Sequence, residues 1–300
     1  MTGQRTSQVA SGLPSPLAKL YERAGLPAWP MPPALAEVYG GGLGFRQPCV
    51  YANFVASVDG VTALGPEYPS SGSAISGHDP ADRFVMGLLR ACADVVLIGA
   101  GTLRATPGHR WTPAHVCPAA ADGYAALRRS HGRRGDPELA VVTARGDLPA
   151  GHPALRAGAL ILTTAAGARR VHGRLPPACT VLDLGDRPEL PPADVLAAVR
   201  SGGGSMVLTE GGPRLLGQLA GDRLLDELFL TISPVLAGRA DTDRPGLVAG
   251  QELLPGPVGP AELLTVRRHG SYLFLRYGCA APGTGHNPAA TSYMLPKKAR

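Results

Sequence analysis

The 300-residue sequence predicts an α/β fold with a mostly parallel central sheet, helices on both faces and an antiparallel hairpin at the C-terminal end. Short continuous apolar runs, which are typical of strands buried on both faces, recur along the chain. Segments with helical apolar spacing alternate with these runs. Near the end of the chain, two segments flank the turn His269-Gly270, which indicates the hairpin.

Three regions are expected from composition. Residues 1–48 are rich in proline and glycine, and we interpret them as an arm that packs on the main domain without forming a second core. Within this arm, 16–23 and 33–39 are predicted as short helices that begin at proline. The main domain is expected at 49–280, and the final residues, 281–300, lack periodicity and predict a disordered tail.

The main domain is expected to alternate strands and helices in chain order. Strands are predicted at 50–57, 94–98, 139–143, 160–164, 179–182, 205–209 and 228–232, and in the hairpin at 261–268 and 271–277. Helices are predicted at 79–92, 193–200 and 213–220.

Composition and charge exclude several functions. The net charge is +6, but the basic residues are scattered and are not interleaved with aromatics, so we expect phosphate-bearing small molecules and no nucleic acid as partners. The five cysteines are odd in number and lack C-x-x-C spacing, and the histidines lack metal-ligand spacing, so no metal site is expected. Neither a signal peptide nor a membrane-spanning run is present in the sequence, which predicts a cytoplasmic protein without a membrane partner.

The first candidate motif follows a buried strand and reads Gly99-Ala100-Gly101-Thr102. Two glycines allow a ligand to approach the backbone, and free N–H groups at the next turn can hold phosphate. Because position 104 is arginine, the full dinucleotide fingerprint is missing. Taken alone, the motif fits a tight turn as well as it fits a cofactor loop.

The second motif is Glu210-Gly211-Gly212-Pro213, again between a buried strand and a helix. Ligands of parallel sheets bind at the carboxyl ends of the strands, so the Glu210 carboxylate is placed to meet the polar edge of a substrate. A helix-capping role for Glu210 is the structural alternative.

Two further residues stand at element ends. Asp59 lies in the turn that follows the strand 50–57, where Asp-Gly is usually structural. Arg90 lies near the end of the helix 79–92, where it either complements the helix dipole or binds a phosphate with two hydrogen bonds.

Taken in order, these motifs resemble the reductase domain of the RibD/RibG riboflavin-synthesis proteins and its stand-alone actinobacterial relatives. The resemblance covers roughly residues 48–278. It rests on 52–60, 75–77, 82–85, 88–91, 93–102, 141–143, 208–213, 225–228 and 233–234. It implies a dihydrofolate-reductase-like fold, a homodimer and NADPH as cofactor.

The resemblance also implies roles for single residues. The cofactor would be bound by Ala56, Gly99, Gly101, Thr102, Thr143, Gly211, Gly212, Leu215 and Leu216. Substrate contacts map to Asp59, Arg90 and Glu210, with Arg90 anchoring a phosphate, Glu210 receiving the amino groups of the pyrimidine and Asp59 orienting the substrate or delivering a proton. Asp59 and Glu210 are therefore the catalytic candidates.

The implied reaction moves a hydride to the ribosyl group of a phosphoribosylaminopyrimidine. The loop 103–111 departs from the family pattern on the substrate side. The segment 112–136 has no counterpart in the short riboflavin reductases, and a lid and a dimer contact are the two roles considered for it. Two alternatives therefore stay open. One is reduction of dihydrofolate or another C=N bond, and the other is a non-catalytic nucleotide- or pterin-binding protein.

Overall fold

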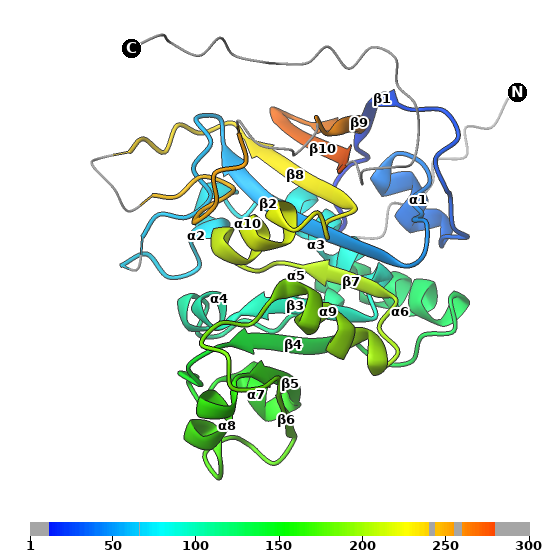
Figure 1. Ribbon diagram of the computed structural model, residues 1–300. Coiled ribbons are helices and arrows are strands. Elements are labelled where there is room, and N and C mark those ends of the chain that lie inside the picture. The colour runs from blue at the N-terminus through cyan, green and yellow to red at the C-terminus, as the bar shows by residue number, and fades with distance from the viewer. Residues whose placement is uncertain (1–11, 66, 240–243, 255–259, 280–300) are drawn as a thin grey trace, which may run out of the picture.

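The computed structural model describes residues 12–65, 67–239, 244–254 and 260–279 of the chain (Figure 1). The tail predicted at 281–300 lies outside these residues. The strands are Ala18–Glu22 (β1), Cys49–Ser57 (β2), Val95–Gly99 (β3), Glu138–Thr143 (β4), Ala159–Thr163 (β5), Cys179–Asp183 (β6), Met206–Thr209 (β7), Glu227–Ser233 (β8), Glu262–His269 (β9) and Tyr272–Gly278 (β10).

The longer helices are Pro33–Tyr39 (α1), Pro80–Cys92 (α3), Ala121–Ser130 (α6), Ala165–Val171 (α8), Pro192–Ser201 (α9) and Pro213–Gly221 (α10). The shorter ones are Ser71–Ile75 (α2), Ala100–Ala105 (α4), Pro113–Val116 (α5) and Pro153–Ala157 (α7), with a 3-10 turn at Pro118–Ala120. Every strand and helix predicted for the main domain is present, with ends that agree to within one residue.

All ten strands form one sheet in the order β1-β9-β10-β8-β2-β7-β3-β4-β5-β6. The strands from β8 to β6 pair in parallel, whereas β10 pairs antiparallel with both β8 and β9, and β1 adds an antiparallel edge. The predicted fold class, a mostly parallel sheet that ends in an antiparallel hairpin, is therefore confirmed. All parallel strands end at the same edge of the sheet, where ligands of such folds bind.

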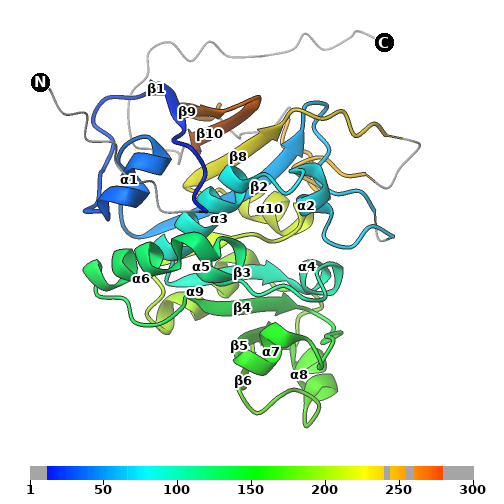
Figure 2. The ribbon, with the colours of Figure 1, turned by 180° about the vertical axis from the view of Figure 1, so that it is seen from behind.

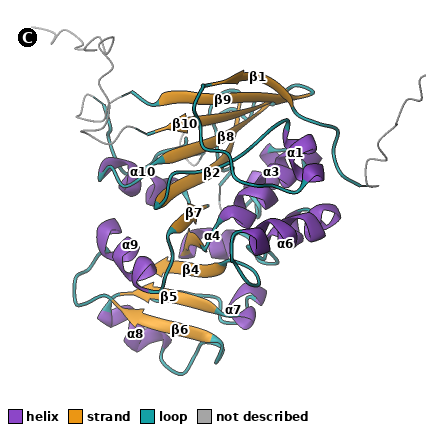
Figure 3. Cartoon of the chain, turned by 90° about the vertical axis from the view of Figure 1, so that its right-hand side faces the viewer, coloured by secondary structure: helices purple, strands orange, loops and turns teal. Residues whose placement is uncertain are grey.

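Helices cover both faces of the sheet. In Figure 3, α1, α3 and α6 lie on one side and α9 and α10 on the other. The larger apolar core joins the first group to the sheet through Phe84, Leu88 and Tyr124, and the second core packs Val195 and Leu216 under the other face. Helix α3 begins cleanly because Pro80 follows Asp79, whose Oδ1 accepts the backbone N–H of Ala81 and Asp82, each at 2.9 Å.

The N-terminal arm differs in one element from its prediction. Residues 33–39 form the expected helix α1, but the helix predicted at 16–23 is wrong, because this segment contains strand β1 paired with β9 (Figure 2). Arg267 in β9 holds the arm in place. Its guanidinium donates to the Glu22 carboxylate at 2.7 Å and to the backbone oxygen of Tyr39 at 2.9 Å. Local propensity is too weak to oppose such tertiary contacts.

The segment 112–136 packs as part of the body of the molecule. It forms α5, the 3-10 turn and α6, which lie against α3. Tyr124 is buried and donates its hydroxyl to the backbone oxygen of Phe84 at 2.8 Å, and its ring leaves no room for a side chain at Gly87. The segment therefore packs on α3 as part of the core.

Candidate functional site

A cavity of about 260 Å³ opens at the edge where the parallel strands end. Strand β2, helices α2 and α3, and the turns that follow β3 and β7 supply its walls. Its lining includes Asn53, Ser73, Asp82, Arg83, Arg90, Thr102, His109, Glu210, Gly211 and Gly212. The structure therefore brings Arg90, Thr102, Glu210, Gly211 and Gly212, all predicted site residues, to one cavity.

Arg90 and Glu210 form a two-point ion pair in the wall of this cavity. Nε of Arg90 lies 2.9 Å from Oε1 of Glu210, and Nη2 lies 2.6 Å from Oε2. The side chain of Arg90 is 1% exposed and that of Glu210 is 9% exposed. Such a fork-to-carboxylate contact fixes the orientation of the carboxylate. Glu210 is therefore held in place by a side chain from α3.

The remaining donors of Arg90 are taken by the loop that precedes α5. Nη1 donates to the backbone oxygens of Arg110 at 3.2 Å and Thr112 at 3.3 Å, and Nη2 also contacts Nε2 of His109 at 2.8 Å. A guanidinium has five N–H groups, and these contacts together with the two to Glu210 number five. Each N–H group of Arg90 thus has a partner within the protein.

His109 is neutral in this arrangement. Burial and the adjacent Arg90 charge lower its pKa to about 2. Because the guanidinium can only donate, Nε2 of His109 is the acceptor and Nδ1 carries the proton. The ring also packs edge-on against Trp111 and His115, with centroid distances of 5.0 and 4.9 Å. The loop 103–111, which departs from the family pattern, is therefore tied to α3 through this histidine.

Asp82 is a buried carboxyl group that lines the same cavity. It is 5% exposed, and burial raises its pKa to about 6, with the carboxylates of Asp79 and Glu210 acting in the same direction. Hydrogen bonds from the hydroxyls of Thr231 and Ser76 lower its pKa in part. A carboxyl group with a raised pKa in a cavity is suited to holding and releasing a proton near neutral pH.

The two glycine turns adjoin at the cavity. Gly99 and Gly212 are the N-cap residues of α4 and α10, and a Cβ on Gly212 would lie 3.6 Å from Oγ1 of Thr102. A Cβ on Gly99 or on Gly101 would meet no atom within 4 Å. Open space above two helix N-termini fits the phosphates of a dinucleotide. The residues present therefore fit the cofactor that the sequence predicts.

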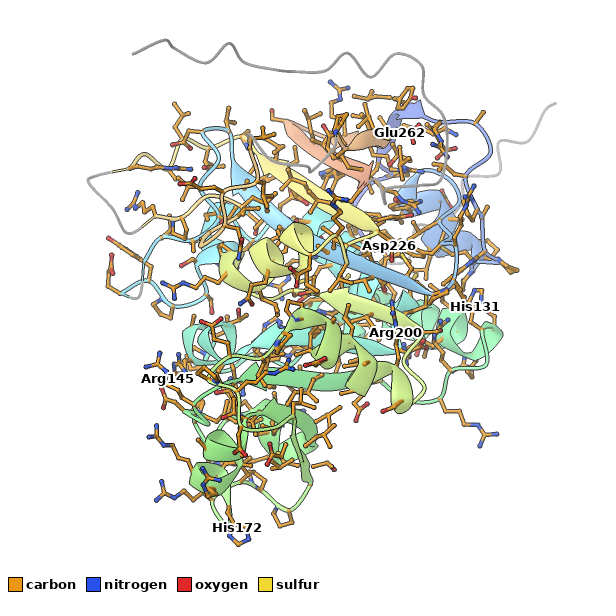
Figure 4. All side chains as sticks on the ribbon, in the orientation of Figure 1. His131, Arg145, His172, Arg200, Asp226 and Glu262 are labelled. Carbon is orange, nitrogen blue, oxygen red and sulfur yellow. The ribbon has the colours of Figure 1, made fainter. Side chains whose placement is uncertain are left out.

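The other predicted cofactor residues do not line the cavity, and Gly99 and Gly101 are among them. Ala56 is buried in β2, and Leu215 and Leu216 are buried in α10 within the core. Thr143 is also buried, and its hydroxyl oxygen accepts the backbone N–H of Gly146 at 3.1 Å. Thr143 ends β4 two residues before the exposed Arg145, which is labelled in Figure 4.

Asp59 is exposed and organises a loop outside the cavity lining. Its carboxylate accepts the Ser57 hydroxyl at 2.6 Å and the backbone N–H groups of Ala237 and Gly238 at 3.0 and 2.8 Å. These hydrogen bonds lower the pKa of Asp59 to about 2, and the one from the Ser57 hydroxyl has the largest effect. Asp59 therefore joins the end of β2 to the loop after β8.

Several residues of the cavity had no role assigned from the sequence. Asp82 and Arg83 stood within the motif on which the resemblance rests, but no local pattern around Asp82, which lies between Ala81 and Arg83, indicated a buried acid. His109 comes from a loop and Ser73 from the five-residue helix α2, and neither segment is long enough to show a periodic pattern that would place it at the site.

No group of three or more His, Cys, Asp or Glu side chains is placed to hold a metal ion in the part of the chain that the structure describes. Among the same residues, no helix has both the length and the apolar character needed to cross a membrane.

Solved structures with the same fold are pyrimidine reductases and related proteins. A pyrimidine reductase-like protein from Corynebacterium diphtheriae is 20% identical, with a TM-score of 0.58, and the match covers 78% of this chain and 92% of that one. RibD from Acinetobacter baumannii is 17% identical, with a TM-score of 0.56 and coverage of 83% and 61%.

A third similar structure comes from Thermotoga maritima, a diaminohydroxyphosphoribosylaminopyrimidine deaminase/5-amino-6-(5-phosphoribosylamino)uracil reductase, with 16% identity, a TM-score of 0.51 and coverage of 78% of this chain and 57% of that one. The present chain thus spans less than two thirds of the two-function enzyme. A comparison with curated proteins finds no match. The RibD C-terminal domain model matches residues 48–255, more than half of the chain. The chain therefore belongs to the RibD C-terminal domain family, with the dihydrofolate-reductase-like fold predicted from its sequence.

Proposed function

We propose that this protein is an NADPH-dependent reductase that acts on the ribosyl group of a phosphoribosylaminopyrimidine. The observation that carries the proposal is the meeting of Glu210, held by Arg90, with the two glycine turns in one cavity of a RibD C-terminal domain. Fold membership alone would not specify a reaction, but the convergence of an oriented carboxylate and a phosphate-compatible turn supports this one.

The cofactor would be held by the turns at Gly99, Gly101 and Thr102 and at Gly211 and Gly212. When bound, NADPH supplies the hydride. The task of the chain is to hold donor and acceptor in register within the cavity.

Glu210 would receive the amino groups of the pyrimidine, since an ionised carboxylate only accepts hydrogen bonds. Its fixed orientation makes it selective for a planar donor edge. Asp59, which the resemblance implied as a catalytic and substrate-binding residue, would act here as a positioning residue, through the loop that its carboxylate organises at the end of β2.

Reduction of dihydrofolate or another C=N bond is the second candidate. The observation that favours it is the saturation of Arg90, whose N–H groups all have protein partners and leave none for a substrate phosphate in this structure. A neutral imine needs no such ligand.

The proposal includes a cytoplasmic homodimer, as the family resemblance implies. Val58 and Val235 are exposed and adjacent, with the Val58 N–H donating to the backbone oxygen of Val235 at 2.9 Å, and Leu236 beside them is 80% exposed. Light scattering after size exclusion tests this part: a mass of two chains supports it, and a mass of one chain contradicts it.

The activity is tested by following the nicotinamide absorbance of purified protein with NADPH and one of two substrates, 5-amino-6-(5-phosphoribosylamino)uracil or dihydrofolate. The first compound is the reductase substrate in the name of the Thermotoga protein. Oxidation with the pyrimidine alone supports the first candidate, and oxidation with dihydrofolate alone supports the second.

A further inference from the structure

We propose that a second copy of this chain docks on the antiparallel part of the sheet, on the face that points away from α1 and α3. This surface is formed by β8, β10, β9 and β1, next to β2. The inference rests on the homodimer of the proposed function, to which it assigns a surface, and it does not depend on the reaction that the protein catalyses.

The two faces of this part of the sheet differ in burial. Phe229 and Phe274 are buried and belong to the larger core, together with Phe84 of α3. Leu230 and Leu275, one residue further along β8 and β10, lie on the opposite face, are partly exposed and belong to neither apolar core. An antiparallel sheet that faces water on one side usually carries polar residues there, so apolar residues on this face indicate that something covers it.

One row of apolar side chains crosses five adjacent strands on this face. Residues that pair directly across neighbouring strands lie on the same face of a sheet. The register joins five of them in order from β2 to β1: Phe54, Leu230, Leu275, Val266 and Tyr21. The next row contains Ile232 and Leu273 and continues to the exposed Arg268. The charge of Arg268 therefore lies toward the edge of an apolar surface.

The helices of the described chain leave this surface open. Figure 1 views the sheet from this side, and none of the described helices lies in front of β9 or β10. Helix α10 is on this side, but its Leu216 packs in the second core with Ala52 of β2 and Val207 of β7. The cover of the sheet on this side therefore ends near β2, before the row reaches β10 and β9.

The area of this face is in the range that a dimer needs. Strands lie about 4.8 Å apart and residues of one face repeat about every 6.8 Å, so three rows across five strands give about 500 Å² of flat surface. Val58, Val235 and Leu236 follow β2 and β8 directly, are 61%, 36% and 80% exposed, and extend the apolar surface beyond the ends of these strands. A stable dimer buries about 800 Å² of accessible surface on each partner, which the face and the loop supply together.

The chemistry of the face favours a second copy over a different protein. Permanent homodimer interfaces are more apolar than interfaces that form and dissociate. A twofold axis brings the same patch of both copies together, so a face that lacks central charges meets no like charge on its partner. Two apolar sheet faces pack with interdigitating side chains at a spacing of about 10 Å. The leucine and isoleucine rows can supply both sides of such a contact.

The test measures the mass of the full-length protein by sedimentation velocity over a range of concentrations. The variant is Leu275→Glu in the middle of the row, and the matched control is Val181→Glu, a residue that is 39% exposed on β6 at the opposite edge of the sheet. We expect wild type and Val181→Glu to have the mass of two chains. In Leu275→Glu the dissociation constant of the dimer should rise at least about a hundredfold, because the contact would bury a carboxylate without a partner.

Circular dichroism checks that Leu275→Glu is folded. If it is not, Leu236→Glu in the exposed loop replaces it, with the same expected loss of the dimer. A wild type with the mass of one chain at every concentration would overturn the inference together with the homodimer. A dimer that persists in both Leu275→Glu and Leu236→Glu would overturn this surface and leave the homodimer standing. A dimer lost in Leu275→Glu but kept in Val181→Glu supports the surface even if the protein oxidises no NADPH, a result that would remove only the proposed reaction.

Discussion

Arg90 and Glu210, 120 residues apart in the chain, meet through two hydrogen bonds of 2.9 and 2.6 Å, so that one buried side chain determines the orientation of the other. Arg90→Met would leave the Glu210 carboxylate uncompensated in a largely buried position. We expect the free energy of unfolding to fall by about 3–5 kcal/mol, measured by urea denaturation. The double variant Arg90→Met/Glu210→Leu should recover a large part of this loss.

The matched control is Arg187→Met. Arg187 pairs with Asp194 at 3.2 Å, but both side chains are exposed, and the expected loss is within about 1 kcal/mol. Equal losses at Arg90 and Arg187, or a double variant as unstable as the single one, would contradict the buried pair.

Asp82 should make stability depend on pH. Burial raises its folded-state pKa to about 6 from an ordinary value of 3.8, so the folded protein binds this proton more tightly than the unfolded chain does. The resulting stabilisation is complete below about pH 4 and is lost as the pH rises through about 6, a change of about 3 kcal/mol. Asp82→Asn should flatten this slope in urea unfolding measured from pH 4 to 7.

Asp122→Asn serves as the comparison for Asp82→Asn, since Asp122 lies exposed in the first turn of α6. Its slope should match that of wild type. If Asp82→Asn keeps the wild-type slope as well, Asp82 is ionised in the folded protein and the proton-holding role is lost.

A substitution at Gly101 can test whether the turn after β3 binds the cofactor without disturbing the fold. A Cβ at this position meets no atom within 4 Å, so Gly101→Val should leave the urea midpoint nearly unchanged while its side chain enters the space available to a dinucleotide. The dissociation constant for NADPH, measured by calorimetry, should rise at least about tenfold. Gly108→Val, which also meets open space but lies outside the turn, should bind NADPH normally. Unchanged NADPH binding by Gly101→Val would move the cofactor away from this turn.

Asp59 is expected to control the loop after β8. Its carboxylate receives two backbone N–H groups, and those hydrogen bonds should protect the amides of Ala237 and Gly238 from hydrogen exchange. In Asp59→Ala, mass spectrometry should show faster exchange in this loop. The amide of Ala249, which donates to the backbone oxygen of Pro213, provides an internal reference that should not change. Unaltered protection of the loop would show that Asp59 does not hold it.

The sequence predicted the layers of this molecule because buried strands and amphipathic helices are local patterns. Strands such as Val95–Gly99 and helices such as Pro80–Cys92 were placed to within one residue. Strand β1 was wrongly predicted as a helix, because all five of its residues are exposed and only pairing with β9 gives it extended structure. Its conformation is decided by contacts more than 200 residues away in the chain.

The same limit applies to the site. The motifs singled out Arg90 and Glu210 one by one, but no local pattern shows that a residue of α3 and a residue after β7 form an ion pair. His109 was not predicted as a site residue for the same reason, since its partner Arg90 lies on another element. Pairing between distant residues, and therefore the number of free donors on an arginine, is a property of the folded chain.

In the proposed function, the protein binds NADPH together with a phosphorylated aminopyrimidine, and NADPH reduces the pyrimidine's ribosyl group. The most direct measurement follows the nicotinamide absorbance of wild type and Glu210→Gln with NADPH and 5-amino-6-(5-phosphoribosylamino)uracil, the substrate in the name of the Thermotoga relative. We predict oxidation of NADPH by wild type and at least about a tenfold lower kcat/KM in Glu210→Gln, with NADPH binding retained. Tight NADPH binding without oxidation in the presence of this pyrimidine, or full activity in Glu210→Gln, would contradict the claim.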